Sequence, residues 1–121
     1  MTGLVYGFTF ARNRVRVELY IDFADGERNK RFFDALLLRR EQIEKSYGES
    51  LQWERLDERR ASRIGIYEDG TIDSDPARLV EIKEWGIRHL LQFKDAFGPL
   101  LKELSRDVFK EEESGVTTLL S

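Results

Sequence analysis

The chain has 121 residues, of which 40% are hydrophobic and 36% are charged, and its formal net charge is −3. This length suits one domain with one hydrophobic core, and the negative balance excludes a global cationic field for nucleic acid. Cysteine is absent, which excludes disulfides, thiolate zinc sites and cysteine nucleophiles. No signal-peptide pattern and no apolar run of membrane-spanning length occur, so we expect a cytoplasmic protein without a membrane partner.

The N-terminal part predicts a β-hairpin from Val5 to Phe23. Apolar and polar residues alternate from 14 to 23, which is the period-2 pattern of a half-buried strand. Arg12-Asn13 fits a two-residue turn, since asparagine tolerates positive φ. The turn sets the cross-strand pairs, which are Phe10 with Val15, Phe8 with Val17, and Tyr6 with Leu19. The large apolar side chains of both strands then share one sheet face.

Two helices and two further strands follow the hairpin. Residues 27–47 carry an apolar stripe at helical spacing, and Gly48 is suited to end this helix. Short apolar segments at about 51–56 and 61–67 predict two more strands. Asp75 and Pro76 then open a second long helix as N-cap and first helical residue. The Gly98-Pro99 pair is expected to break or kink that helix.

This β-β-α-β-β-α order predicts an α+β fold. The simplest arrangement is a two-layer sandwich, in which two long helices cover one face of a four-stranded antiparallel sheet. Residues 1–104 are expected to form this single domain. Residues 105–121 contain an acidic run followed by small polar residues, and we expect them to form a poorly ordered C-terminal tail.

The other face of the predicted sheet is free, and the hairpin register indicates which residues it carries. They are Arg14, Arg16, Glu18, Tyr20, Gln52, Glu54, Arg63 and Tyr67. Arginines interleaved with tyrosines on an open sheet can bind single-stranded nucleic acid by stacking and phosphate contacts. The alternative is a solvated face with cross-strand ion pairs. The two glutamates argue against a pure phosphate platform, so we expect weak nucleic-acid binding at most.

The segment from Leu51 to Ile64 is the most densely charged part of the chain. Arginine and carboxylate side chains at this density are expected to pair, so we predict one network of Glu54, Arg55, Asp57, Arg60 and Arg63, partly shielded by Trp53. Together with the free sheet face, this segment gives the candidate binding residues. They are Arg14, Arg16, Glu18, Tyr20, Glu54, Arg55, Asp57, Arg60 and Arg63.

No set of residues has the spacing of a catalytic or metal site. Glu81-Ile82-Lys83 matches the E-x-K half of a restriction-type nuclease motif, but it falls in the predicted second helix instead of a strand. Glu18 and Asp22 lie about 13 Å apart along one strand, which is too far to share one ion. His89 is the only histidine and has no serine or aspartate partner at a recognisable spacing. We therefore expect no metal, no cofactor and no catalytic residue.

A set of short motifs carries a family resemblance. They are Arg16-Val-Glu-Leu-Tyr-Ile-Asp22, Asn29-Lys30, Phe33-Asp34, Trp53-Glu-Arg-Leu-Asp57 and Arg60-Ala-Ser-Arg-Ile64. From about Phe8 to Leu101 the chain resembles a prokaryotic domain family of unknown function, which is often found C-terminal to restriction-endonuclease-like (PD-(D/E)xK) nuclease domains. The resemblance supplies no catalytic residues that could be carried over to this chain. Because no nuclease domain precedes Met1, we expect an excised domain or a stand-alone relative.

These observations favour a non-catalytic interaction module, which docks onto a protein partner or associates with itself in the company of a nuclease or a DNA restriction system. One alternative is a nucleic-acid-binding module that uses the arginine and tyrosine sheet face, which would need a contiguous arginine-rich surface. A second is a nuclease-related hydrolase that uses carboxylates near 54–57, and a third is a ligand-binding domain with a pocket between sheet and helices. Self-association would need an exposed apolar patch.

Overall fold

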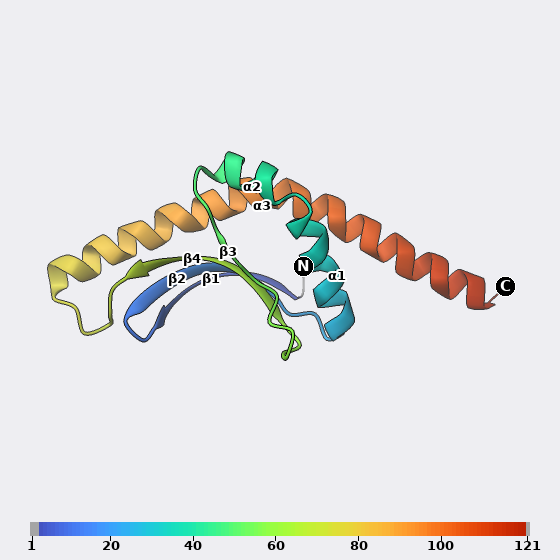
Figure 1. Ribbon diagram of the computed structural model, residues 1–121, viewed down its shortest axis with the longest axis horizontal. Helices are drawn as coiled ribbons and strands as arrows, with labels where there is room; N and C mark the ends of the chain where they lie inside the picture. Colours follow the sequence, from blue (N-terminus) through green and yellow to red (C-terminus); the bar gives the residue numbers. More distant parts are fainter. Residues whose placement is uncertain (1–2, 121) are drawn as a thin grey trace.

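The computed structural model describes residues 3–120, with side chains as far as residue 106. Four antiparallel strands form one sheet in the order β1-β2-β4-β3, and they are β1 (Leu4–Ala11), β2 (Arg14–Ile21), β3 (Gln52–Glu54) and β4 (Ser62–Asp69). The helices α1 (Gly26–Leu37), α2 (Arg40–Tyr47) and α3 (Pro76–Leu120) lie on one side of the sheet (Figure 1). The predicted α+β fold is therefore confirmed, with three helices in place of two.

The β1–β2 hairpin has the register that the sequence predicts. The observed pairs are Phe10 with Val15, Phe8 with Val17, and Tyr6 with Leu19. The two-residue turn is also as predicted, although the positive φ of 58° belongs to Arg12 and not to Asn13. Because β2 is a central strand, its helix-facing side chains are fully buried, and these are Val15, Val17, Leu19 and Ile21.

The single helix predicted for residues 27–47 is wrong, because this segment forms two helices. α1 ends where the Leu38 N–H donates to the Asp34 carbonyl, and the Leu38 side chain is 90% exposed. The break lets α2 direct its own apolar residues, Ile43 and Tyr47, into the core. Helical periodicity does not reveal such a break, since each half keeps an apolar stripe of its own.

α3 begins as predicted, and at Gly98-Pro99, where a break or a kink is expected, the helix does not end. Asp75 Oδ1 accepts a hydrogen bond of 2.9 Å from Arg78 N, so Asp75 is the N-cap. Pro99 lies inside the helix, and Figure 1 shows a bend about half-way along it. Proline removes one helical hydrogen bond, which explains a kink without an end. The side chains of residues 107–121 lie outside the described part of the chain, so the poorly ordered tail at 105–121 stays a prediction.

α3 crosses the hairpin at close range. A Cβ atom at Gly86 would lie 2.3 Å from Phe8 Cε2, so only glycine allows this approach between α3 and β1. Trp85 packs on the same phenylalanine, with ring centroids 6.4 Å apart. Along its next turns α3 packs against α2, where the Tyr47 and Phe93 rings meet edge to face. All of these contacts are on one face of the sheet, and no helix within residues 3–120 covers the other face (Figure 1).

Candidate functional site

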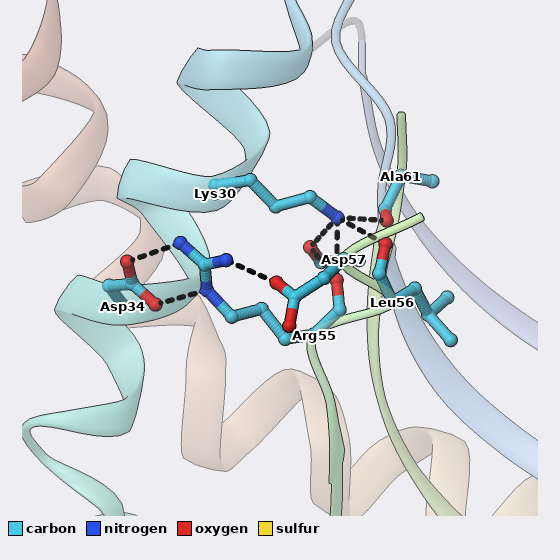
Figure 2. Close-up of polar contacts among 7 residues, drawn as sticks. Lys30, Asp34, Arg55, Leu56, Asp57 and Ala61 are labelled. Atoms are coloured by element: carbon cyan, nitrogen blue, oxygen red, sulfur yellow. Dashed lines mark hydrogen bonds and ion pairs between the residues drawn. The ribbon is translucent and has the colours of Figure 1, made fainter. Parts of the chain in front are cut away.

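Lys30 of α1 holds the connection between β3 and β4, which comprises residues 55–61. Its Nζ donates to the carbonyls of Arg55, Leu56 and Ala61 at 2.5, 2.8 and 2.7 Å, and to Ser62 Oγ at 3.0 Å (Figure 2). An ammonium group has three donors, so four oxygens saturate it. Burial lowers the pKa of Lys30, and the nearby Asp57 carboxylate opposes that shift. The lysine therefore acts as a clamp on this connection.

Arg55 adds a second link between the β3–β4 connection and α1. Its Nε and Nη2 donate to the two carboxylate oxygens of Asp34 at 2.9 and 3.0 Å, and its Nη1 donates to Asp57 (Figure 2). This is the fork geometry in which arginine binds carboxylates most strongly. The hydrogen bonds from Arg55 lower the pKa of Asp34. Both carboxylates are thereby occupied by the guanidinium group of Arg55.

Leu56 is held in a strained backbone conformation at the centre of this arrangement. Its φ is 55°, in the left-handed region that disfavours residues with a Cβ atom. Its carbonyl accepts from both Lys30 Nζ and the Arg59 N–H, the latter at 2.8 Å. Such a conformation persists only where its surroundings determine it. A hollow of about 280 Å³ lies beside this turn, and it is lined by Leu56, Asp57, Glu58, Arg59 and Arg63.

Asn29, beside Lys30 in α1, ties the far end of the same connection. Its fully buried amide accepts from Phe23 N at 2.6 Å and donates to the carbonyls of Phe23 and Arg60 at 3.0 and 2.9 Å. The Arg60 side chain then forks onto Asp22 with hydrogen bonds of 2.8 and 3.0 Å. These hydrogen bonds lower the pKa of the Asp22 carboxyl. Adjacent polar residues of α1 therefore hold both ends of the connection.

The free face of the sheet carries a separate cluster, the Glu18 network, formed by Arg16, Glu18, Glu54, Arg63 and Tyr67. Glu18 Oε2 lies 3.1 Å from Arg16 Nε and 3.6 Å from Arg63 Nη1, in ion pairs without hydrogen-bond geometry. Glu54 Oε2 accepts from Arg63 Nε at 3.1 Å and from the Tyr67 hydroxyl at 2.6 Å. The side chains of Glu18 and Arg63 are only 11% and 13% exposed. The charged side chains of the Glu18 network are therefore paired with one another.

Glycines on the neighbouring strands let the Glu18 network lie flat on the sheet. Gly7 and Gly65 are the cross-strand partners of Glu18. A Cβ atom at Gly65 would lie 3.3 Å from the Val17 carbonyl oxygen and 3.6 Å from Arg16 Cγ. Burial, and then the hydrogen bond to Glu54, raise the pKa of Tyr67. Arg16 and Arg63 of this face are paired with the neighbouring glutamates Glu18 and Glu54.

The outer surface of α3, which faces away from the sheet, carries a third feature. Val80, Ile87 and Leu91 are 56%, 50% and 57% exposed. Their spacing of seven and four residues places them on one side of the helix. Exposed apolar residues that gather on one face mark interaction surfaces more often than scattered ones do.

Residues 1–101 match the family described as Domain of unknown function (DUF4268). The chain belongs to this family. Neither the curated proteins nor the solved structures give a match. The match confirms the predicted resemblance to a domain family of unknown function over nearly the same residues, and the association with nucleases stays a prediction. The sheet, α1 and α2 all lie within the DUF4268 region, so both polar clusters belong to it.

The DUF4268 structure divides the predicted charged network among three places. Arg55 and Asp57 are at α1, Arg60 is at Asp22, and Glu54 and Arg63 are on the free sheet face with Arg16 and Glu18. Arg14 lies on the same face, 4.1 Å from the Tyr67 ring centroid, and Tyr20 is the cross-strand neighbour of Arg63. The predicted shielding by Trp53 is wrong, because Trp53 packs on Phe33 and donates to Glu44 on the helix side.

Sequence reasoning did not identify Lys30 and Asn29 as the residues that organise the charged segment. In the sequence they stand out only as part of the family motif Asn29-Lys30. The feature that could have identified Asn29 is its position on the buried side of α1, where an apolar residue is usual. A buried amide in an apolar stripe needs hydrogen-bond partners from elsewhere in the fold.

Replacement of Arg63 by Ala tests whether the Glu18 network is structural. We expect the free energy of unfolding to fall by about 1–2 kcal/mol, because nearly buried Glu18 and partly buried Glu54 lose their shared cation. Urea unfolding measures the loss, and Arg59→Ala, at an exposed position, is the control that should change stability little. Unchanged stability together with the loss of a bound partner would instead make Arg63 a binding residue.

The remaining titratable candidate, His89, is a core residue of this DUF4268 domain. It shares a hydrogen bond with the Tyr47 hydroxyl through Nδ1 and packs on Trp85 at 4.6 Å between ring centroids. Burial lowers its pKa. The described residues hold no group of three or more histidine, cysteine, aspartate or glutamate side chains placed to bind a metal ion. No helix in the described part of the chain has the length and hydropathy to cross a bilayer.

Proposed function

We propose that this DUF4268 domain is a non-catalytic interaction module that docks a protein through the outer surface of α3. The observation that carries the proposal is the exposure of Val80, Ile87 and Leu91, each at least half exposed, on one side of a helix whose opposite side is buried. A docked protein would remove this apolar surface from water, which is the main driving force of association. The resemblance to domains appended to restriction-endonuclease-like nucleases favours an accessory role beside such an enzyme.

The polar clusters support a structural role for the charged residues. Arg55 and Arg60 are forked onto Asp34 and Asp22, and Arg63 is shared by Glu18 and Glu54. Cations that are already paired with carboxylates offer little to a phosphate backbone, whose binding depends on releasing counterions. Carboxylates that are paired with arginines are likewise poor candidates for activating water. These pairings favour protein docking over the nucleic-acid and hydrolase alternatives.

Site-specific photo-cross-linking tests the docking surface. A photo-reactive phenylalanine derivative replaces Ile87 in the full chain, and Glu58, which is exposed on the β3–β4 connection, is the control position. After irradiation in cells that carry the neighbouring genes, we expect a protein adduct from position 87 and none from position 58, with the linked peptide identified by mass spectrometry. Adducts from position 58 alone, or from neither position, would contradict docking through α3.

The same purified chain tests the hydrolase alternative. It is incubated with single- and double-stranded DNA in the presence of Mg²⁺ or Mn²⁺. We expect no metal-dependent cleavage above the level of a buffer control. Cleavage that requires metal and is lost in Glu54→Gln would replace the proposed function by a carboxylate-dependent one.

A further inference from the structure

The exposed side of α3 is a continuous stripe and not three isolated residues. Positions separated alternately by four and three residues stay on one side of a helix. On the outer surface of α3 these positions define the α3 stripe, which comprises Val80, Glu84, Ile87, Leu91, Lys94 and Gly98. Its first five residues are exposed, and Gly98 is half-buried. The α3 stripe spans about 27 Å of helix, at a rise of 1.5 Å per residue, and ends before Pro99.

The α3 stripe is complementary to itself when it is reversed about position 89. Ile87 then faces Leu91 of a second copy, and Glu84 faces Lys94. At the ends, Val80 faces Gly98, so that a larger side chain lies opposite a residue that has none. In an antiparallel pair of helices, such two-fold symmetry produces each contact twice. The apolar layers therefore lie at the centre, with an ion pair on either side.

We propose that the α3 stripe binds the same stripe of a second copy of the chain, antiparallel and about a two-fold axis near position 89. This inference rests on the proposed function, since it names the protein that occupies the docking surface of α3. In a parallel, in-register pair Glu84 would face Glu84 and Lys94 would face Lys94. Like charges at such positions disfavour an arrangement, and opposite charges select its orientation.

Glu84 and Lys94 are available for this pairing. Among the described side chains, neither has an ion-pair or hydrogen-bond partner within the chain, in contrast to the arginines of the sheet and the β3–β4 connection. Neither needs to give up an existing contact when two copies meet. With only two apolar residues in the central layers of each copy, we expect a reversible and concentration-dependent dimer.

Charge reversal tests the pairing in the purified full chain, where no other protein is present. In sedimentation equilibrium we expect Glu84→Lys and Lys94→Glu each to raise the dimer dissociation constant by roughly tenfold or more, because each places like charges together. The variant carrying both changes should return to near the wild-type value, since the pairs are restored with reversed sign. Glu41→Lys changes the net charge equally at an exposed α2 position and should have no such effect.

Cysteine cross-linking tests the orientation, and the natural chain contains no cysteine that could interfere. Ile87→Cys combined with Leu91→Cys should oxidise to a covalent dimer, because these positions face each other in the antiparallel arrangement. Val80→Cys alone should not, because the two copies of position 80 are then about 27 Å apart and a disulfide requires Cα atoms within ~7 Å. Rapid cross-linking of Val80→Cys alone would indicate a parallel pair and overturn the proposal.

The outcomes separate this inference from the proposed function. A wild-type chain that stays monomeric at several hundred micromolar, or a double charge reversal that does not restore dimerisation, overturns pairing with a second copy. If position 87 still cross-links to a different protein in cells, α3 remains a docking surface and only its occupant is wrong. If position 87 gives no adduct and the chain is monomeric, both fail. Self-adducts at position 87 and rescue by the double reversal support both.

Discussion

Replacement of Lys30 by Met is expected to lower the free energy of unfolding by about 3 kcal/mol. Hydrogen bonds to a charged donor contribute roughly 1.5–3 kcal/mol each, and water replaces the lysine as the donor to some of the freed carbonyl oxygens. The methionine keeps most of the side-chain length but leaves the carbonyls of Arg55, Leu56 and Ala61 without their shared donor. It also removes the contact that holds Leu56 at a φ of 55°. Urea unfolding followed by tryptophan fluorescence, with Trp53 and Trp85 as probes, measures the loss.

The control for this prediction is Lys45→Met. Lys45 is exposed on α2, and substitutions at such positions usually change stability by less than about 0.5 kcal/mol. A local readout comes from hydrogen exchange, since the Arg59 amide that donates to the Leu56 carbonyl should exchange faster in Lys30→Met. An unfolding midpoint equal to that of the wild type would show that water replaces the lysine without cost.

Replacement of Asn29 by Ala is expected to lower the free energy of unfolding by about 4 kcal/mol, because a buried polar group that loses its partner costs roughly 1–3 kcal/mol. The side chain is fully buried and makes three hydrogen bonds, so the change leaves Phe23 N, the Phe23 carbonyl and the Arg60 carbonyl without it. Guanidinium unfolding at equilibrium provides the measurement, with the slope compared to confirm two-state behaviour.

Gln42→Ala is the matched control for Asn29→Ala, because it removes a similar amide from an exposed position of α2. It should leave the midpoint close to that of the wild type. If the two variants lost equal stability, the hydrogen bonds of Asn29 would contribute nothing beyond helix propensity. A loss confined to Asn29→Ala would locate the effect in the link between α1 and the β3–β4 connection.

Both variants also bear on the proposed function. Lys30 and Asn29 belong to α1, whereas the α3 stripe lies on the outer surface of another helix. A folded variant at either position should therefore keep the dimer dissociation constant of the wild type, while Glu84→Lys changes that constant and leaves stability unaffected. This separation is expected because the charged β3–β4 connection stabilises the domain and the α3 stripe serves association.

The hairpin and the helix starts were determined by short-range features of the sequence. Alternation from 14 to 23 and a two-residue turn predicted the pairing of Phe8 with Val17, and the structure has that pairing. Asp75 caps α3 as predicted, and Gly48 has the left-handed conformation expected at the end of α2. These features depend on residues a few positions apart, for which the stereochemistry of the backbone leaves few solutions.

The partners of the charged residues were decided only by the tertiary structure. The dense charge at 51–64 predicted pairing but not the partners, because Arg55 binds Asp34, Arg60 binds Asp22, and Lys30 binds a turn that is more than twenty residues away in sequence. The break between α1 and α2 had the same origin, since packing against α3 and not local propensity directs Ile43 and Tyr47 inward. The position of a charged residue in the sequence does not tell which opposite charge it will pair with. Many ion pairs are possible, and the packing of the helices against the sheet decides which of them form.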